Sequence, residues 1–314
     1  MNVEPKSLAP AYIALSVGIV LTACSAIFVK IAMLPGTTTA FYRVLFAAAV
    51  AVPWCLWLQP SLPARKAMWS AFAGGVCFAA TAVLWNSSLL VTSAANATLL
   101  LHLAPMWIGL SALLLFRERL GSYFWAGLVI ALAGMALVVS GGTRQLASFN
   151  YGDVLAVGSS FFYALYLLVT QRVRATMDAL TFFALAAASS VVVLLVTCVA
   201  LGVPLSGFSA RAWAALAAMG LVSHLGGYLA INYALGHMRA TSVSVSLLSQ
   251  PVITALLSIP LLGELLSAQQ IIGGALVLGG IYLVNRRSSP GSSIRKQPLS
   301  MGGRQDKSLQ RTRG

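Results

Sequence analysis

Polar side chains that could hold a small molecule recur at regular intervals inside long apolar segments of this sequence. His224, Tyr228 and Asn232 follow one another at spacings of four residues, so in a helix they share one face. Tyr163 and Tyr166 belong to a similar row. Polar groups within apolar spans are costly and usually face a bundle interior or an aqueous cavity. Both rows are therefore candidates for holding a solute by hydrogen bonds and aromatic contacts.

Further candidates lie on other apolar segments. His102 is included, like His224, because an imidazole that faces lipid is hard to satisfy. Competing interpretations stay open, since the tyrosines also suit a bilayer interface and the asparagines also suit hydrogen bonds between helices. The predicted substrate-binding residues are Trp85, Asn86, His102, Tyr163, Tyr166, His224, Tyr228, Asn232 and Gln250.

Arg43 is a cation about five residues inside the second apolar segment. Its long side chain can extend back to the membrane surface and leave the segment apolar. It can equally hold a substrate carboxylate or the carboxyl end of a helix. The sequence leaves these interpretations open.

Acidic and metal-ligating residues are too scattered for catalysis. Asp153, Glu118 and Glu264 stand at the ends of apolar segments, so no buried carboxylate is available to exchange protons for a cationic solute. The three histidines and four cysteines lack metal-type spacing, and the phosphate-binding pattern G-x-x-x-x-G-K-[ST] is absent from the sequence. We therefore expect no enzymatic activity, no metal and no cofactor, and a neutral or zwitterionic solute.

The segments that carry these residues are long enough to cross a membrane. The chain has 314 residues, of which 59% are hydrophobic and 8% are charged. Such a composition cannot solvate the surface of a water-soluble protein of this size. About 20 apolar helical residues match the bilayer core, which predicts ten spans. They lie near residues 11–29, 38–58, 68–90, 95–116, 122–140, 152–170, 180–201, 212–235, 241–262 and 268–285.

Basic residues are distributed unevenly between the two sides of these spans. The side that holds the N-terminus carries ten near-membrane Lys and Arg residues and the other side carries three. This bias places both termini in the cytoplasm. The net charge of +14 thus reflects topology, and no nucleic-acid partner is expected. The basic tail at 287–314 has too little apolar surface to fold alone, which predicts disorder.

The two halves of the chain share an ordered pattern of residues that are rare in spans. A shift of 146 residues without gaps places Asn86 on Asn232 and Pro105 on Pro251. Each half would contain five spans, an odd number, so the second half must be inverted in the membrane. Inverted repeats are the usual construction of secondary transporters, because the halves can exchange outward-open and inward-open shapes.

The two prolines are predicted to loosen the fourth span of each half. Proline lacks a backbone N–H and interrupts helical hydrogen bonding, so Pro105 and Pro251 are candidate hinges for two alternate gates. His102, one turn before Pro105, is expected to meet substrate. Energy coupling stays open between facilitated passage and a proton relay through His102 or His224.

The pattern resembles the EamA family of the drug/metabolite transporter superfamily. The resemblance covers about residues 11–286 and rests on each half's proline followed thirteen residues later by glutamate, and on a closing G-x6-G-x3-V. That closing pattern comprises Gly127, Gly134 and Val138 in one half and Gly273, Gly280 and Val284 in the other. The tryptophan common early in the first and sixth spans of the family is absent, since Ser25 and Phe162 stand there.

The resemblance implies an all-α membrane protein with ten transmembrane helices in two inverted five-helix repeats. The expected organisation is a cytoplasmic N-terminus at 1–10, repeats at 11–140 and 152–286, and the tail. It also implies a bacterial inner-membrane exporter of small metabolites, amino acids first, that works in the lipid bilayer as a monomer or homodimer. Another neutral solute or drug, such as a sugar or nucleoside, is the alternative cargo. A membrane-embedded lipid-processing enzyme is the remaining alternative.

Overall fold

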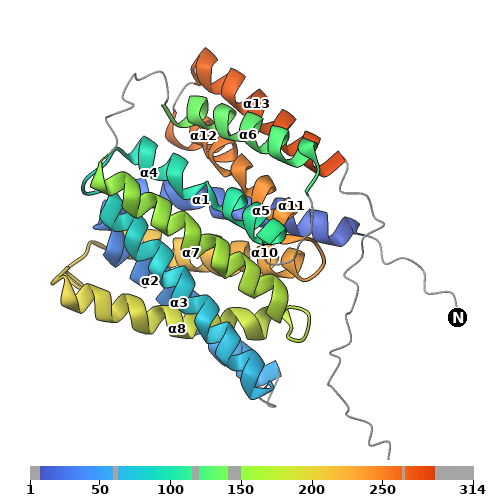
Figure 1. Ribbon diagram of the computed structural model, residues 1–314. Coiled ribbons are helices and arrows are strands. Elements are labelled where there is room, and N and C mark those ends of the chain that lie inside the picture. The colour runs from blue at the N-terminus through green and yellow to red at the C-terminus, as the bar shows by residue number, and fades with distance from the viewer. Residues whose placement is uncertain (1–7, 59–62, 115–119, 141–149, 264–265, 287–314) are drawn as a thin grey trace, which may run out of the picture.

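A computed structural model describes residues 8–58, 63–114, 120–140, 150–263 and 266–286 (Figure 1). Within these ranges the secondary structure is helical and contains no strand. Ten helical stretches in the described part are long and apolar enough to cross a membrane. The predicted all-α fold with ten spans is confirmed. Glu118, Glu264 and the predicted disordered tail lie outside the described residues.

Seven of the ten spans are single α-helices, and three are divided. The first half contains α1 (Ala9–Ala32), α2 (Gly36–Leu58), α3 (Arg65–Ser88), α4 (Ala94–Leu101), α5 (Ala104–Leu114) and α6 (Ser122–Ser140). The second contains α7 (Tyr151–Val173), α8 (Ala179–Ala200), α9 (Ala210–Ala218), the π-helix η1 (Met219–Gly227), α10 (Tyr228–Leu235), α11 (Ala240–Ser246), the 3₁₀-helix η2 (Leu247–Ser249), α12 (Gln250–Leu262) and α13 (Ala268–Arg286).

The fourth span of each half breaks at its proline. Pro105 is the second residue of α5, and Pro251 is the second residue of α12. Proline is tolerated in the first turn of a helix, where its missing N–H is not needed, so each span restarts there. The breaks are repeat-equivalent, because His102–Leu103 and Leu248–Ser249 differ by 146 positions. The structure thus shows an interruption next to each proline, and the hinge role of the two prolines stays a prediction.

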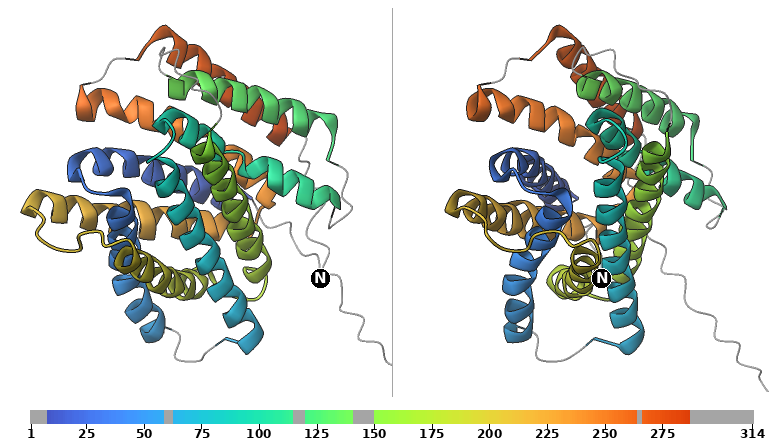
Figure 2. Two further views of the ribbon diagram at one scale, coloured as in Figure 1. Left: turned by 60° about the vertical axis from the view of Figure 1, so that its left-hand side comes forward. Right: turned by 90° about the vertical axis from the view of Figure 1, so that its left-hand side faces the viewer.

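The two repeats meet symmetrically along α6 and α13, which lie side by side in Figures 1 and 2. A Cβ added to Gly127 would lie 2.7 Å from the backbone oxygen of Gly280. One added to Gly134 would lie 2.6 Å from the backbone oxygen of Gly273. Since Gly273 and Gly280 are the repeat-equivalents of Gly127 and Gly134, the contact is the same on both sides, as an inverted repeat requires. Small residues at such a crossing let two membrane helices approach backbone to backbone.

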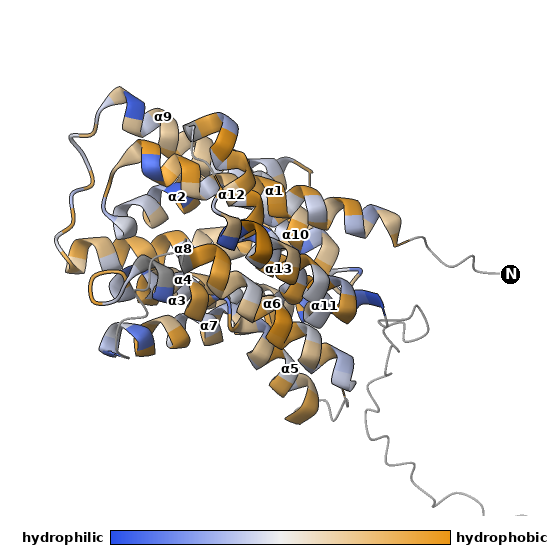
Figure 3. Ribbon diagram, turned by 90° about the horizontal axis from the view of Figure 1, so that it is seen from above, coloured by the Kyte–Doolittle hydropathy of each residue, from blue (hydrophilic) through white to orange (hydrophobic). Residues whose placement is uncertain are grey.

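The helices consist mainly of hydrophobic residues in the hydropathy colouring of Figure 3, and many large apolar side chains are exposed on the outside of the bundle. On α8, for example, Val192, Val196 and Val199 are each more than half exposed. A water-soluble protein would bury such residues, whereas a membrane protein turns them to lipid. The polar side chains of the spans consequently gather inside the bundle.

The two ends of the bundle can be named by residues that lie there. At one, the Gly36 end, Gly36 abuts Asn86, and Gly152 at the start of α7 abuts Ser88. At the other, the Arg174 end, the guanidinium of Arg174 after α7 lies against Gly236 after α10. Because α7 runs from the first end to the second, these are opposite ends of the bundle.

Candidate ligand-binding cavity

A cavity of about 380 Å³ lies among helices of both repeats. It begins midway through the bundle, where Tyr163, Tyr228 and Gln250 line it, and reaches the exposed Gly36. Cavities of this size accept small organic molecules. The first half contributes α1, α2, α3 and the end of α4, and the second contributes α7, η1, α10 and α12.

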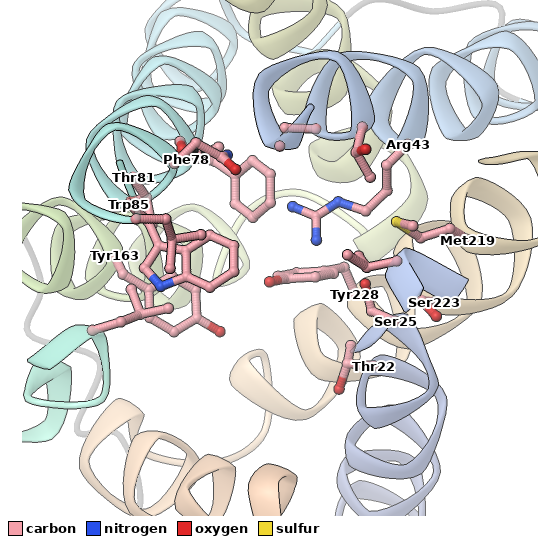
Figure 4. Close-up of a pocket in the computed structure, with 18 of the residues that line it drawn as sticks. Thr22, Ser25, Arg43, Phe78, Thr81, Trp85, Tyr163, Met219, Ser223 and Tyr228 are labelled. Atoms are coloured by element: carbon pink, nitrogen blue, oxygen red, sulfur yellow. Dashed lines mark hydrogen bonds between the residues drawn. The ribbon is translucent and has the colours of Figure 1, made fainter. Parts of the chain in front are cut away.

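The structure brings six of the nine predicted binding residues to this cavity. Those that line it are Trp85, Asn86, His102, Tyr163, Tyr228 and Gln250. They come from five different spans, so the sequence rows alone did not establish that they meet. In Figure 4, Trp85 and Tyr163 lie on one side of the cavity and Tyr228 lies across from them.

The other three predicted residues are not among the cavity's lining residues. The hydroxyl of Tyr166 donates a hydrogen bond to Asn232 Oδ1 at 3.0 Å, and both side chains are buried. His224 packs between Phe78 and Phe183, with ring centroids 5.0 and 5.4 Å away. In this conformation these residues pack the bundle behind the cavity wall.

The π-helix η1 explains why His224 and Tyr228, which were predicted to share one helix face, do not both line the cavity. A π-helix is wider than an α-helix, so residues before Tyr228 do not keep the α-helical spacing. Ser223 and Tyr228 line the cavity, whereas His224 turns behind Tyr228 at a centroid separation of 4.9 Å. Two glycines allow the close packing of η1. A Cβ on Gly220 would lie 2.9 Å from the backbone oxygen of Arg43, and one on Gly227 would lie 2.6 Å from the Thr22 side chain.

Aromatic rings form much of the cavity wall. Phe78 contacts Tyr228 edge to face at a centroid distance of 5.1 Å, and Tyr163 stacks on Tyr166 at 6.2 Å. These contacts fix the rings before any ligand arrives. A rigid wall of aromatic faces suits an apolar or aromatic solute body.

Polar side chains at mid-bundle connect three spans. Gln250 Nε2 donates to Thr22 Oγ1 at 2.6 Å, and the Gln250 side chain lies close enough to His102 to interact with its ring. His102 Nδ1 lies 2.8 Å from the carbonyl oxygen of Thr98. Since a carbonyl only accepts, Nδ1 carries the hydrogen there and Nε2 is the nitrogen left without one in the neutral ring.

Arg43 faces this cavity, which favours the interpretation that it holds a substrate carboxylate; that role stays a prediction. Its guanidinium carbon lies 5.7 Å from the centroid of the Phe78 ring, and Figure 4 shows the group pointing into the cavity. Its Nε is buried and has no hydrogen-bond partner among the described residues. Buried donors that lack a partner in the structure also occur on Thr39, Trp85 and Ser223, which line the same cavity.

Thr39 and Ser223 were not predicted as binding residues. Thr39 precedes Arg43 by one helical turn, so the spacing was available in the sequence. Ser223 carried no such signal, because its position depends on η1. Among the described residues, no group of three His, Cys, Asp or Glu side chains is arranged to hold a metal ion.

Comparison with known proteins agrees with this architecture. The model of the EamA-like transporter family matches residues 9–140 and 150–286. An uncharacterized transporter of Archaeoglobus fulgidus is 27% identical over 287 residues, covering 88% of this chain and 97% of that protein. A probable terminal-alkyne amino-acid exporter of Streptantibioticus cattleyicolor is 27% identical over 228 residues, covering 72% and 75%.

A crystal structure with 20% sequence identity superposes with a TM-score of 0.76 and covers 89% of this chain and 98% of its own. At that identity the likeness concerns the fold.

Proposed function

Because the chain belongs to the EamA-like transporter family, we propose that it exports small metabolites, amino acids first, across a bacterial inner membrane. The observation that carries the proposal is the cavity between the repeats, which reaches one end of the bundle. Inverted-repeat transporters hold their substrate near the membrane midplane and open it to each side in turn. Alternating access between the two halves is the mechanism that we propose here.

Amino acids are proposed as cargo for two reasons. The cavity combines aromatic walls with hydroxyl, amide and guanidinium groups, which suit a small solute with a carboxylate. A relative that covers 72% of the chain is named a probable terminal-alkyne amino-acid exporter. Sugars, nucleosides and neutral drugs are the competing cargoes.

The proposed orientation follows from the basic residues. With both termini cytoplasmic, the Gly36 end is extracytoplasmic and the conformation described here is outward-facing. Each chain contains both repeats and a complete cavity, so we propose that a monomer suffices for transport, alone or within a homodimer.

Transport by the purified protein in liposomes tests this function. We expect liposomes preloaded with unlabelled amino acid to accumulate the labelled amino acid by exchange. An added panel of amino acids, sugars and nucleosides ranks the cargoes by competition. Recovery of the labelled compound chemically unchanged distinguishes transport from an enzymatic reaction.

Two glycine variants provide a matched pair for this assay. In Gly36→Trp the new side chain begins 1.9 Å from Asn86 Oδ1, so it must crowd the cavity mouth and should abolish exchange. Gly279→Trp adds the same side chain to α13, where a Cβ meets no atom within 4 Å, and should exchange like the wild type. Equal exchange by both variants, or failure of the wild type to exchange any amino acid, would contradict the proposal.

A further inference from the structure

We infer that Arg43 binds a carboxylate of the substrate, so the cavity selects small monocarboxylates with an apolar or aromatic body. The inference rests on the proposed transport function and narrows its substrate class. It states that the carboxylate is required and that the amino group of an amino acid is not.

The first argument is the charge balance of the cavity. Arg43 is the cation among its described lining residues, and no Asp or Glu is present among them. A guanidinium stays protonated in a protein, and withdrawing its charge from water is costly unless a partner compensates. The face of Phe78 at 5.7 Å gives partial compensation and leaves the N–H groups available for an anion.

Arg174 provides a comparison, because its guanidinium has a structural role in binding backbone carbonyls. Arg174 donates from Nε to the backbone oxygen of Asn232 at 3.0 Å, and from its terminal nitrogen to the backbone oxygen of Met177. It therefore binds one carbonyl in the last turn of α10 and one in the loop between α7 and α8. The Nε of Arg43 makes no such bond, so a helix-capping role does not account for its position.

Neighbouring donors extend the site. Thr39 lies one turn before Arg43 on α2, and the indole of Trp85 faces the cavity from the side opposite Arg43 (Figure 4). Both have a buried donor atom without a partner in the structure. A carboxylate has about four acceptor sites and pairs with a guanidinium through two parallel hydrogen bonds, so it can satisfy several of these donors together.

The same charges discriminate against amines. An ammonium group would meet the positive field of Arg43 and would find no carboxylate side chain among the described lining residues. Amides and hydroxyls can hydrogen bond to an amino group but do not require one. Removing the carboxylate should therefore weaken binding more than removing the amino group.

Competition in the liposome assay tests the inference. Labelled L-phenylalanine is exchanged against unlabelled L-phenylalanine, 3-phenylpropanoate, L-phenylalaninamide and phenethylamine. For the wild type we expect both carboxylates to compete, and the amide and amine to need at least about tenfold higher concentrations, as befits loss of a charged hydrogen bond. In Arg43→Gln the apparent affinity for both carboxylates should fall about tenfold or more and the discrimination should disappear.

Controls separate binding from folding. Arg172 is exposed on α7, so Arg172→Gln removes the same charge outside the cavity and should keep the wild-type ranking. Arg43→Lys keeps the charge but not the planar fork and should retain intermediate affinity. If Arg43→Gln fails to purify as a folded protein, Trp85→Phe, which deletes one donor and keeps an aromatic ring, should lower carboxylate affinity selectively.

The possible results distinguish the inference from the function on which it rests. Unchanged carboxylate affinity in Arg43→Gln, or equal competition by acid and amide in the wild type, would overturn the inference and leave transport intact. Exchange of 3-phenylpropanoate without exchange of any amino acid would overturn the proposed cargo and support the carboxylate site. Transport of sugars or nucleosides alone would overturn both.

Discussion

The Gly36 end and the Arg174 end of the bundle are built from repeat-equivalent residues, yet one contains a cavity and the other is packed. Trp85, Asn86 and Leu89 line the cavity. Their equivalents Ile231, Asn232 and Leu235 have exposed fractions of 0%. An inverted repeat with equal halves would have either two cavities or none. Under the alternating access that we propose, this difference corresponds to one of the two conformations that the inverted halves would exchange.

Side chains at the Arg174 end show how it is closed. Tyr166 bonds to Asn232 and Arg174 joins α10 to the loop between α7 and α8, whereas Asn86 Nδ2 bonds to the carbonyl of Ala82 in its own helix at 2.7 Å. The packed end is thus held by bonds between helices, and the open end has mainly local bonds at the equivalent position. Opening the Arg174 end would require breaking the former.

Chemical accessibility should differ most strongly between the two ends. Leu89→Cys and Leu235→Cys, placed in a chain whose four native cysteines are replaced, occupy equivalent positions. A minor conformation is typically populated at 0.1–10%, so a water-soluble thiol reagent should label Leu235→Cys about ten- to a thousandfold more slowly. Mass spectrometry of timed samples gives the two rates. Similar rates would show that the ends are equally open in the membrane.

Replacing each of the two equivalent asparagines should lower the free energy of unfolding by a different amount. Asn232→Ala leaves the buried Tyr166 hydroxyl without its partner, at a cost of about 1–3 kcal/mol in the free energy of unfolding. Asn86→Ala removes a hydrogen bond within one helix at the cavity wall and should cost about 0.5–1 kcal/mol.

Thermal unfolding of the purified variants measures both losses. Combining Tyr166→Phe with Asn232→Ala should cost less than the sum of the single changes, because the two groups form one interaction. A larger loss for Asn86→Ala than for Asn232→Ala would reverse the assignment of the two ends.

Replacing either proline at the two helix breaks should have a smaller effect on exchange, and the effect should be similar for both. Pro105→Ala and Pro251→Ala restore a backbone N–H at each break and allow a continuous helix, so exchange should slow several-fold while membrane insertion is unchanged. Pro53→Ala is the matched control, because Pro53 is exposed within α2 and lies away from the breaks and the cavity. Unaltered exchange in both variants would remove the prolines from the gating mechanism.

Much of the fold could be predicted because the membrane imposes simple rules on sequence. Span lengths follow bilayer thickness, and the interruptions at Pro105 and Pro251 follow from a missing N–H. The first span is predicted at 11–29 and observed as α1 at Ala9–Ala32. Terminal residues of a helix differ little in hydropathy from their neighbours, so such boundaries were the least defined.

The candidate site was less predictable because it depends on how spans pack. No local rule indicated η1, whose wider turn depends on the approach of α1 and α2 to Gly220 and Gly227. Consequently the spacing that grouped His224 with Tyr228 did not place both on the cavity. Arg43 was noticed as a cation about five residues inside the second span, but the direction of its side chain required the structure.

The glycine contact between α6 and α13 also bears on the origin of the chain. In a symmetric dimer, residue i of one copy meets residue j of the other and j meets i. Gly127 with Gly280 and Gly134 with Gly273 reproduce that reciprocity inside one polypeptide. A five-helix ancestor able to insert in both orientations would have formed the same contact with a second copy of itself. Gene fusion would then have allowed the two halves to diverge. In a dimer of identical copies, an arginine at the position of Arg43 would occur twice. A single Arg43 in one half therefore requires two halves that differ in sequence.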